Sequence, residues 1–222
     1  MKPTEVLARE RTRDGEELTL TRHDGAYYLN LAGTALMSSR AHGSERALAT
    51  FGCATLPKER PRVLVGGLGF GYTLRATLDV CPRDARIVVA EISGLVITAN
   101  EGEIGALAER PLKDRRVTVV HDDVRNTLGR EPFDAILLDV DNGPRAFTMV
   151  SNERLYSQAG LELIKRSLAS RGTLAVWAEA PDPGFERRFE RAGFETRVEQ
   201  VRATESGRGP RHTIYLGRRP KV

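Results

Sequence analysis

The sequence has few of the residues on which metal sites and redox centres depend. Its 222 residues include two cysteines, Cys53 and Cys81, and four histidines. Neither set follows the spacing of a metal site or of a redox motif. We therefore expect two reduced, partly buried thiols and no bound metal.

Long apolar runs are also missing. No run approaches the length of a membrane span, and the first residues, MKPTEVLARERTRDGEE, do not have the pattern of a signal peptide. We expect a cytoplasmic protein that makes no contact with a membrane. The hydrophobic share of 40% and the charged share of 29% are ordinary for one globular domain plus a small appendage.

A concentrated basic surface is not indicated either. The net charge is +4 and the pI is about 9.3. The basic residues are spread along the chain and mixed with acids, as in ERRFERAGFETR, and they lack the interleaved aromatics typical of nucleic-acid binding. We expect no nucleic-acid partner.

The most informative stretch that is present is 62–75, which reads RVLVGGLGFGYTLR. An apolar run enters a glycine turn, and a helix-compatible segment follows. In this order of strand, tight turn and helix, free backbone N–H groups face a ligand above the strand end. The spacing G-x-G-x-G is more typical of nucleosides with an amino-acid-like tail than of dinucleotides, and a turn that binds nothing is the alternative. The predicted cofactor-binding glycines are Gly66, Gly67, Gly69 and Gly71.

Residues 1–56 are predicted to form a small region of their own. Alternating residues indicate strands at 17–22 and 26–31, joined by a hairpin turn at 23–25, with 33–39 as a third strand. A helix follows at 44–53, with Ser44 as its N-cap. A sheet of two or three strands is marginal alone, so we expect a homodimer that forms through this region.

Residues 57–222 are predicted to be a Rossmann-like catalytic domain. Continuous apolar runs alternate with helical segments, as in a parallel sheet covered on both faces, and a hairpin closes the chain. The fold class is therefore α/β, a Rossmann-like seven-stranded methyltransferase-type sheet with a small N-terminal β appendage. The predicted strands are 63–65, 87–90, 117–120, 135–138, 173–177, 194–201 and 211–216. The predicted helices are 72–78, 95–108, a short one after residue 123, 152–169 and 182–192.

Four successive strands of this sheet end in acidic residues. Ligands of such sheets sit outside the carboxyl ends of the strands, and an acid about 20 residues after the glycine turn typically binds ribose hydroxyls. For each acid, a role as a helix cap, turn or surface residue is the alternative. In strand order, the acids are Glu91, then Asp122 and Asp123, then Asp139 and Asp141, then Glu179.

Carboxylates in these positions suit transfer from a sulfonium nucleoside to an amine. The acceptor amine is a cation at neutral pH and has no lone pair until it loses a proton. A carboxylate after the fourth strand would bind the ammonium group and take that proton as general base. In-line attack on carbon would then release a neutral thioether.

The motifs resemble those of the spermidine synthase (polyamine aminopropyltransferase) family, including its bacterial spermidine-synthase-like branch, over residues 28–178. The resemblance implies a transferase of polyamine biosynthesis that takes decarboxylated S-adenosylmethionine and a small-molecule amine. It also implies that Glu91 binds the ribose and Asp123 binds the adenine. Asp139 would be the base that takes the proton of the attacking amine, and Asp141 would help to hold the charged amine. The similar segments are LNLAGTALMS, VLVGGLGFGYTLR, VVAEIS, VTVVHDDVRNTL, FDAILLDVDNGP and LYSQAGLELIKRSLASRGTLAVW.

The chain also departs from that family. Gly69 stands where the family has an Asp that disfavours the carboxylate of intact S-adenosylmethionine. The second Asp-Pro of the catalytic loop is replaced by Asp141-Asn142, and of the family's Tyr-His-Glu only Glu45 is kept.

The polar segment 38–45 is predicted either to close over the acceptor or merely to cap the following helix. Arg40 and His42 favour an acceptor with an acidic or polar group over a bare polyamine. The predicted substrate-binding residues are Arg40, His42, Glu45 and Glu179. For Trp177, Tyr72 and Phe70 a place in the wall of the pocket and a place in the core are both open, and the core is the more common place for such residues.

Two other functions remain open. One is a methyltransferase on the same fold that uses intact S-adenosylmethionine, which Gly69 and Arg40 favour. The other is a non-catalytic nucleoside-binding homologue that has lost its acceptor site.

Overall fold

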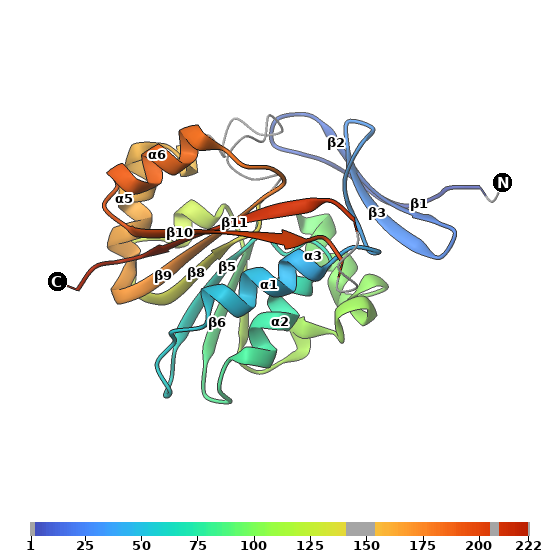
Figure 1. Cartoon of the computed structure of the whole chain (residues 1–222). Coiled ribbons are helices and arrows are strands. Elements are labelled where there is room, and N and C mark those ends of the chain that lie inside the picture. The colour runs from blue at the N-terminus through green and yellow to red at the C-terminus, as the bar shows by residue number, and fades with distance from the viewer. Residues whose placement is uncertain (1–2, 141–153, 205–208, 222) are drawn as a thin grey trace.

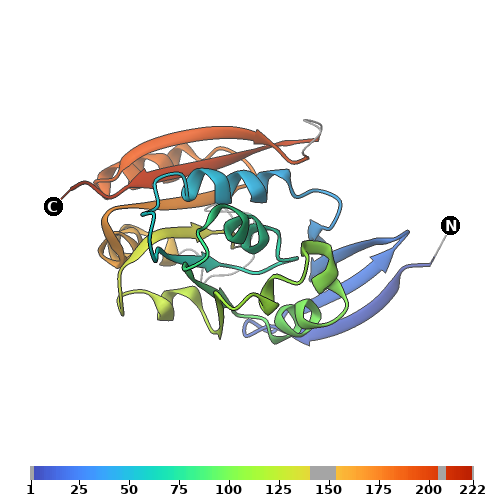
Figure 2. The ribbon, with the colours of Figure 1, turned by 90° about the horizontal axis from the view of Figure 1, so that it is seen from below.

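The computed structural model describes residues 3–140, 154–204 and 209–221 (Figure 1). Two sheets form the molecule: a seven-stranded sheet of order β10-β11-β9-β8-β5-β6-β7 and a four-stranded sheet of order β1-β2-β3-β4. The predicted α/β fold with a Rossmann-like seven-stranded sheet and a small β appendage is confirmed. The small sheet lies at the end of the molecule that carries the N-terminus, opposite the C-terminus (Figures 1 and 2).

The large sheet has five parallel strands and a closing antiparallel hairpin. Strands β5 to β9 pair in parallel, β11 pairs antiparallel with β9, and β10 pairs antiparallel with β11. The central strands are buried on both faces, which explains their continuous apolar runs. The strands are β5 (Arg62–Gly66), β6 (Arg86–Glu91), β7 (Val117–His121), β8 (Phe133–Leu138), β9 (Leu168–Ala178), β10 (Glu195–Arg202) and β11 (Arg211–Arg218).

Helices cover both faces of the large sheet, and successive residues of one strand serve two separate cores. Leu137 of β8 packs with the core beneath α1 and α2, whereas its neighbours Ile136 and Leu138 pack with the core beneath α5 and α6. The α-helices are α1 (Gly43–Gly52), α2 (Tyr72–Val80), α3 (Gly94–Glu101), α5 (Gln158–Ser167) and α6 (Pro183–Arg191). The 3-10 helices are η1 (Ile104–Ala108), η2 (Pro111–Lys113) and η3 (Val124–Thr127).

The small sheet has one strand more than the sequence predicted. The hairpin of β2 (Glu17–His23) and β3 (Ala26–Leu31) is confirmed, as is the third strand, β4 (Thr34–Ser38). The missed strand is β1 (Glu5–Arg11), which pairs with β2. Its register shifts between Val6 and Ala8, so its apolar residues do not alternate cleanly.

Three expectations about helices were wrong. Ser44 is not an N-cap, because α1 begins at Gly43 and the cap position is occupied by His42. The helix predicted over 95–108 is two elements, α3 and η1, which Gly102 and Glu103 separate. In the described part of 152–169, α5 begins only at Gln158 and its last predicted residues belong to β9.

Helix α1 belongs to the proposed N-terminal region yet packs on the large sheet. It contacts α2, β8 and β9. A Cβ atom on its last residue, Gly52, would lie 2.2 Å from Cδ2 of Leu137. The boundary between 1–56 and 57–222 therefore stays a prediction. No helix in the described ranges has the length and apolar character needed to cross a membrane.

Candidate active site

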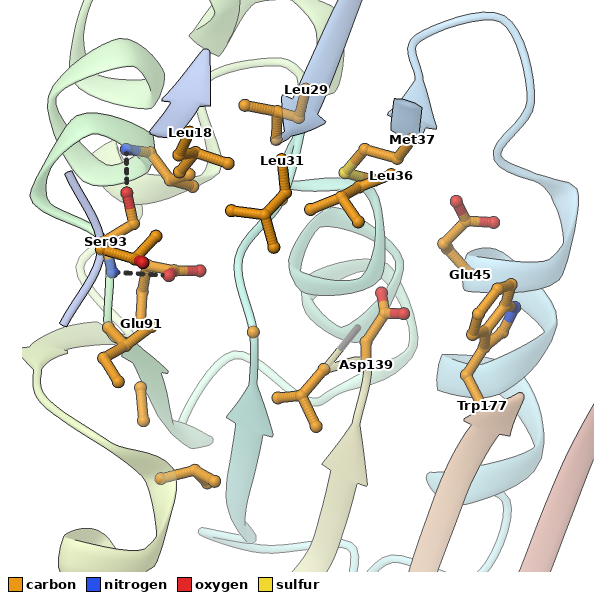
Figure 3. A pocket seen from close by; sticks show the side chains of 18 of the residues that line it. Leu18, Leu29, Leu31, Leu36, Met37, Glu45, Glu91, Ser93, Asp139 and Trp177 are labelled. Carbon is orange, nitrogen blue, oxygen red and sulfur yellow. Dashed lines mark hydrogen bonds between the residues drawn. The ribbon is translucent and has the colours of Figure 1, made fainter. Parts of the chain in front are cut away.

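A cavity of about 640 Å³ lies where the carboxyl ends of the parallel strands face the small sheet. Figure 3 shows its two sides. Glu91, Asp139 and Trp177 stand on the strand ends of the large sheet, and Glu45 stands on α1 beside them. The opposite side comes from the small sheet, and the residues labelled there form an apolar wall. Its labelled residues are Leu18, Leu29, Leu31, Leu36 and Met37.

The glycine turn forms the centre of the cavity floor. Gly67 and Gly69 line it, and both have left-handed backbones, with φ of +87° and +49°. A Cβ atom on Gly67 would lie 2.2 Å from the carbonyl oxygen of Asp139, so only glycine fits between the two strands there. Gly66 ends β5 and Gly71 caps α2, and neither lines the cavity. The turn therefore places the backbone of Gly67 and Gly69 against the cavity, and the binding role of the four glycines stays a prediction.

Glu91 is buried beside this turn and lines the cavity. Its Oε2 accepts the backbone N–H of Leu68 at 2.8 Å, and its Oε1 accepts the N–H of Ser93 at 2.8 Å. The N-cap of α3 is Ser93, not Glu91. Each carboxylate oxygen has a second lone pair, so the contacts with Leu68 and Ser93 do not by themselves use up its capacity for ribose hydroxyls.

Asp122 and Asp123 also line the cavity, but both make local contacts. Asp123 caps η3 and forms an ion pair of 2.7 Å with Arg125. Although burial works to raise it, the pKa of Asp123 is lowered by hydrogen bonds from Arg125. Asp122 accepts the N–H of Asp123 and the amide of Asn126, which lower its pKa. Both acids therefore line the cavity, and part of their hydrogen-bonding capacity is used to stabilise the loop after β7.

Asp139 lies directly after β8, against the glycine turn. Its backbone N–H donates to the carbonyl of Gly66 at 2.8 Å, and its Oδ2 accepts the hydroxyl of Thr73 on α2 at 2.6 Å. Burial raises the pKa of Asp139 to about 6, and the bond from Thr73 opposes that rise. A carboxylate with this pKa is ionised at neutral pH and is a far stronger base than a solvated one.

Glu45 is the second acid at this end of the cavity and is itself 8% exposed. Burial, and then the negative charge of Asp139, raise the pKa of Glu45 to about 7. Neither Glu45 nor Asp139 forms an ion pair with Lys or Arg in the described part of the chain. Two carboxylates that share a site without a counter-ion favour a cationic ligand.

The remaining predicted residues are divided between the site and its surroundings. Glu179 lines the cavity. Arg40 does not: its guanidinium donates to the carbonyl of Asp24 at 3.2 Å. His42 stacks on the ring of Tyr72 at 4.4 Å, and it does not line the cavity either. Asp141 lies outside the described residues.

Several lining residues were not predicted as site residues. Trp177, for which the sequence left the wall and the core both open, lines the cavity, while Tyr72 and Phe70 are buried. His212 reaches the cavity from β11 and Glu10 reaches it from β1. Position at the carboxyl end of β9 marks Trp177, but nothing local in the sequence marks His212 and Glu10, because only the tertiary fold brings them here.

Metal ligands do not gather in the described ranges, where no group of three or more His, Cys, Asp or Glu side chains is placed to hold an ion. Cys53 and Cys81 are free thiols and both are buried.

Comparison with known proteins identifies the fold. No family model matches the sequence, and no curated protein matches it by sequence. Spermidine synthase in complex with the transition-state analogue AdoDATO aligns with a TM-score of 0.72 at 19% identity, covering 98% of this chain and 73% of that chain. Spermidine synthase from Thermotoga maritima aligns with a TM-score of 0.74 at 19% identity, covering 98% of this chain and 74% of that one. The chain has the spermidine synthase fold.

A third structure agrees. A probable spermidine synthase from Corynebacterium glutamicum ATCC 13032 aligns with a TM-score of 0.65 at 18% identity, covering 98% of this chain and 81% of that chain. At these identities the likeness is one of fold.

The glycine turn of this spermidine synthase fold has a local peculiarity. Gly69 is the position at which the resemblance expects an Asp, and a Cβ atom there would lie 2.9 Å from Sδ of Met37. Met37 on β4 therefore occupies the space that a side chain at position 69 would need.

Proposed function

We propose that this protein transfers an alkyl group, of the aminopropyl type, from a sulfonium nucleoside to a small-molecule amine. The donor we propose is decarboxylated S-adenosylmethionine. It would lie over Gly67 and Gly69 with its ribose at Glu91 and its adenine near Asp123. The AdoDATO-bound neighbour, a spermidine synthase of the same fold, supports a ligand of this class.

One observation carries the proposal: Asp139 and Glu45 stand together at the cavity end next to the glycine turn, without a cationic partner in the described ranges. Such a pair attracts an ammonium group, and because the pKa of Asp139 is raised to about 6, proton transfer from the ammonium to this carboxylate costs less free energy than transfer to a solvated one. Asp139 would take that proton as general base, which leaves the amine lone pair free to attack the carbon bound to sulfur. The C–S bond breaks as the C–N bond forms, and the sulfur leaves as a neutral thioether.

The test is the identity of the nucleoside product. We expect the purified protein, given decarboxylated S-adenosylmethionine and a panel of amines, to form methylthioadenosine, which mass spectrometry identifies. Asp139→Asn should lower kcat by about 100-fold or more while donor binding stays within a few-fold. Asp79→Asn removes an exposed carboxylate at the far end of α2 and serves as the matched control.

A methyltransferase that uses intact S-adenosylmethionine is the second candidate. Gly69 favours it, because no carboxylate stands there to repel that of the donor. Arg40, which also favoured it from the sequence, is bound to Asp24 outside the cavity. The same assay is therefore repeated with intact S-adenosylmethionine as the donor, and formation of S-adenosylhomocysteine there, with no methylthioadenosine from the decarboxylated donor, would decide for the methyltransferase. Binding of a nucleoside with neither product would decide for a non-catalytic protein.

A further inference from the structure

A hydrogen-bonded chain leads from the proposed acceptor end of the cavity to the closing hairpin. The hydroxyl of Ser44 donates to Oε2 of Glu45 at 2.6 Å, and Nδ1 of His212 lies 2.9 Å from the same hydroxyl oxygen. Ser44 is completely buried. Ser44 and His212 are 168 residues apart in sequence, so only the packing of α1 against β11 brings them together.

The number of available hydrogen atoms fixes the donor and the acceptor of each hydrogen bond in this series. A serine hydroxyl has a single hydrogen, and when Glu45 is ionised that hydrogen points to the carboxylate. The contact of 2.9 Å between Ser44 and His212 is then a hydrogen bond only if the imidazole donates from Nδ1 to the serine oxygen. The chain therefore runs from His212 through Ser44 to Glu45, with both hydrogens directed toward the carboxylate.

The imidazole is held in place for this role. The ring of Trp177 packs edge-on against His212, with ring centroids 4.7 Å apart. Burial lowers the pKa of His212, although the charge of Glu179 opposes this, so the ring is neutral at neutral pH. A neutral imidazole with its hydrogen on Nδ1 fits the chain.

Glu45 needs such support, because its other surroundings oppose its charge. Burial disfavours the carboxylate, and so does the charge of Asp139. The phenol of Tyr72 also faces this group, and burial, with the charge of Glu45, raises its pKa to about 12, so Tyr72 stays neutral. Among the side chains around Glu45, the bond from Ser44 is the one that favours the ionised form.

We infer that His212 is a positioning residue that, through Ser44, keeps the carboxylate of Glu45 ionised and oriented beside Asp139. The inference rests on the proposed function, in which the acceptor ammonium binds between these acids. Two carboxylates rather than one then face the ammonium group, and the second is aligned through Ser44 by His212 of the closing hairpin.

The first test does not depend on activity. Titration of the Glu45 carboxyl group by carbon-detected NMR is expected to give a higher pKa in Ser44→Ala and in His212→Leu than in the unsubstituted protein. His212→Asn places an amide N–H where Nδ1 was and should restore the original pKa. An unchanged pKa in Ser44→Ala and His212→Leu would overturn the inference, and so would a failure of His212→Asn to restore it.

The second test is kinetic. Loss of a hydrogen bond to a charged group corresponds to a change of about tenfold or more in a rate or equilibrium constant. Ser44→Ala and His212→Leu should therefore each lower kcat by about tenfold. The acidic limb of the pH–rate profile should move to higher pH in both. The double variant should be no slower than either one, since both remove the same chain. A purely structural role predicts lower thermal stability with an unmoved pH profile, and that result would refute a positioning role.

The two tests separate this inference from the proposed function. His23→Leu, which removes a half-buried imidazole on β2 that does not line the cavity, is the matched control for both. If the Glu45 titration responds as expected but no thioether is formed with any amine, the proposed transfer fails and the chain from His212 to Glu45 stands. If transfer occurs and the titration does not respond, the proposed function stands and the role of His212 fails.

Discussion

At the scale of single residues, the site depends on carboxylates held in surroundings that oppose their charge. Asp139 is pressed against the glycine turn, and Glu45 is buried on α1. Folding therefore has to bring two negative charges together with little solvent around them. The burial that raises their pKa values must also weaken the folded state.

This predicts a pH dependence of stability. The pKa values of Asp139 and Glu45 in the folded protein, about 6 and about 7, lie above the ordinary values of 3.8 and 4.5. Protonation therefore favours folding: this contribution is full below pH of about 4 and is lost as the pH rises through about 7. Asp139→Asn should raise the free energy of unfolding at pH 8 by about 1–3 kcal/mol, with the gain vanishing near pH 4.

Urea denaturation at several pH values measures this, with Asp79→Asn as the exposed control. Equal stability of the Asp139→Asn variant and the unsubstituted protein at pH 8 would show that Asp139 is not destabilised by its surroundings.

Thr73 gives a second prediction at this scale. Its hydroxyl donates to Asp139 at 2.6 Å and favours the ionised form. Thr73→Val keeps the shape but removes the donor, so the pKa of Asp139 should rise and the acidic limb of the pH–rate profile should shift upward by about 1 pH unit. Thr73→Ser keeps the hydroxyl and should leave the limb in place. A Thr73→Val profile that coincides with that of Thr73→Ser would contradict the assignment of Asp139 as the base.

At the scale of elements, the glycine turn after β5 packs closely against the backbone at the end of β8. Gly67 and Gly33 provide a matched comparison, because both have left-handed backbones, with φ of +87° and +81°. A Cβ atom on Gly33 meets nothing within 4 Å, whereas one on Gly67 meets the backbone of Asp139.

Gly33→Ala should therefore cost about 1–2 kcal/mol of stability from backbone strain alone. Gly67→Ala should cost at least about 3 kcal/mol and abolish donor binding, because the turn and Asp139 must separate. Thermal unfolding measures the loss of stability in each variant. Fluorescence of Trp177, the single tryptophan of the sequence, measures donor binding. Equal losses in the two variants would mean that the space around Gly67 does not matter.

The elements were largely predictable from local patterns, and the site was predictable only in part. Continuous apolar runs and the glycine spacing depend on neighbours in the chain, so β5, α2 and the acids after each strand could be placed. Strand β1 was missed because its bulge breaks the alternation of apolar residues. Ser44 was misread as a cap because only the contact with His212 reveals why a serine stands there.

At the scale of the whole molecule, the cavity lies between two sheets that polar contacts join, among them those of Arg22 and Tyr27 with Glu103. Glu10 of β1 accepts the hydroxyl of Ser93 and the backbone N–H of Leu95, both at 2.7 Å. These bonds attach the small sheet to the N-terminus of α3, directly above the predicted ribose site. The predicted homodimer, which would form through the small sheet, stays a prediction that sedimentation analysis tests.

The link through Glu10 predicts a specific kinetic result. Glu10→Ala should loosen the apolar wall, because two hydrogen bonds at the start of α3 are lost. KM for the donor is then expected to rise by about tenfold with little change in kcat. Glu5→Ala removes an exposed acid of the same strand and should alter neither. A fall in kcat at constant KM would mean that the small sheet takes part in the chemical step.

The attachment of Asp139 to the glycine turn has a consequence for how this molecule tolerates motion. The proposed base, Asp139, is joined to the turn through the Gly66 bond and to α2 through the Thr73 bond. The apolar wall is a different piece of the chain. Movement of that wall would change how often a donor is captured, while the alignment of base and donor tail would be preserved. Substitutions in the small sheet would then change the affinity for the donor and leave the turnover step unchanged.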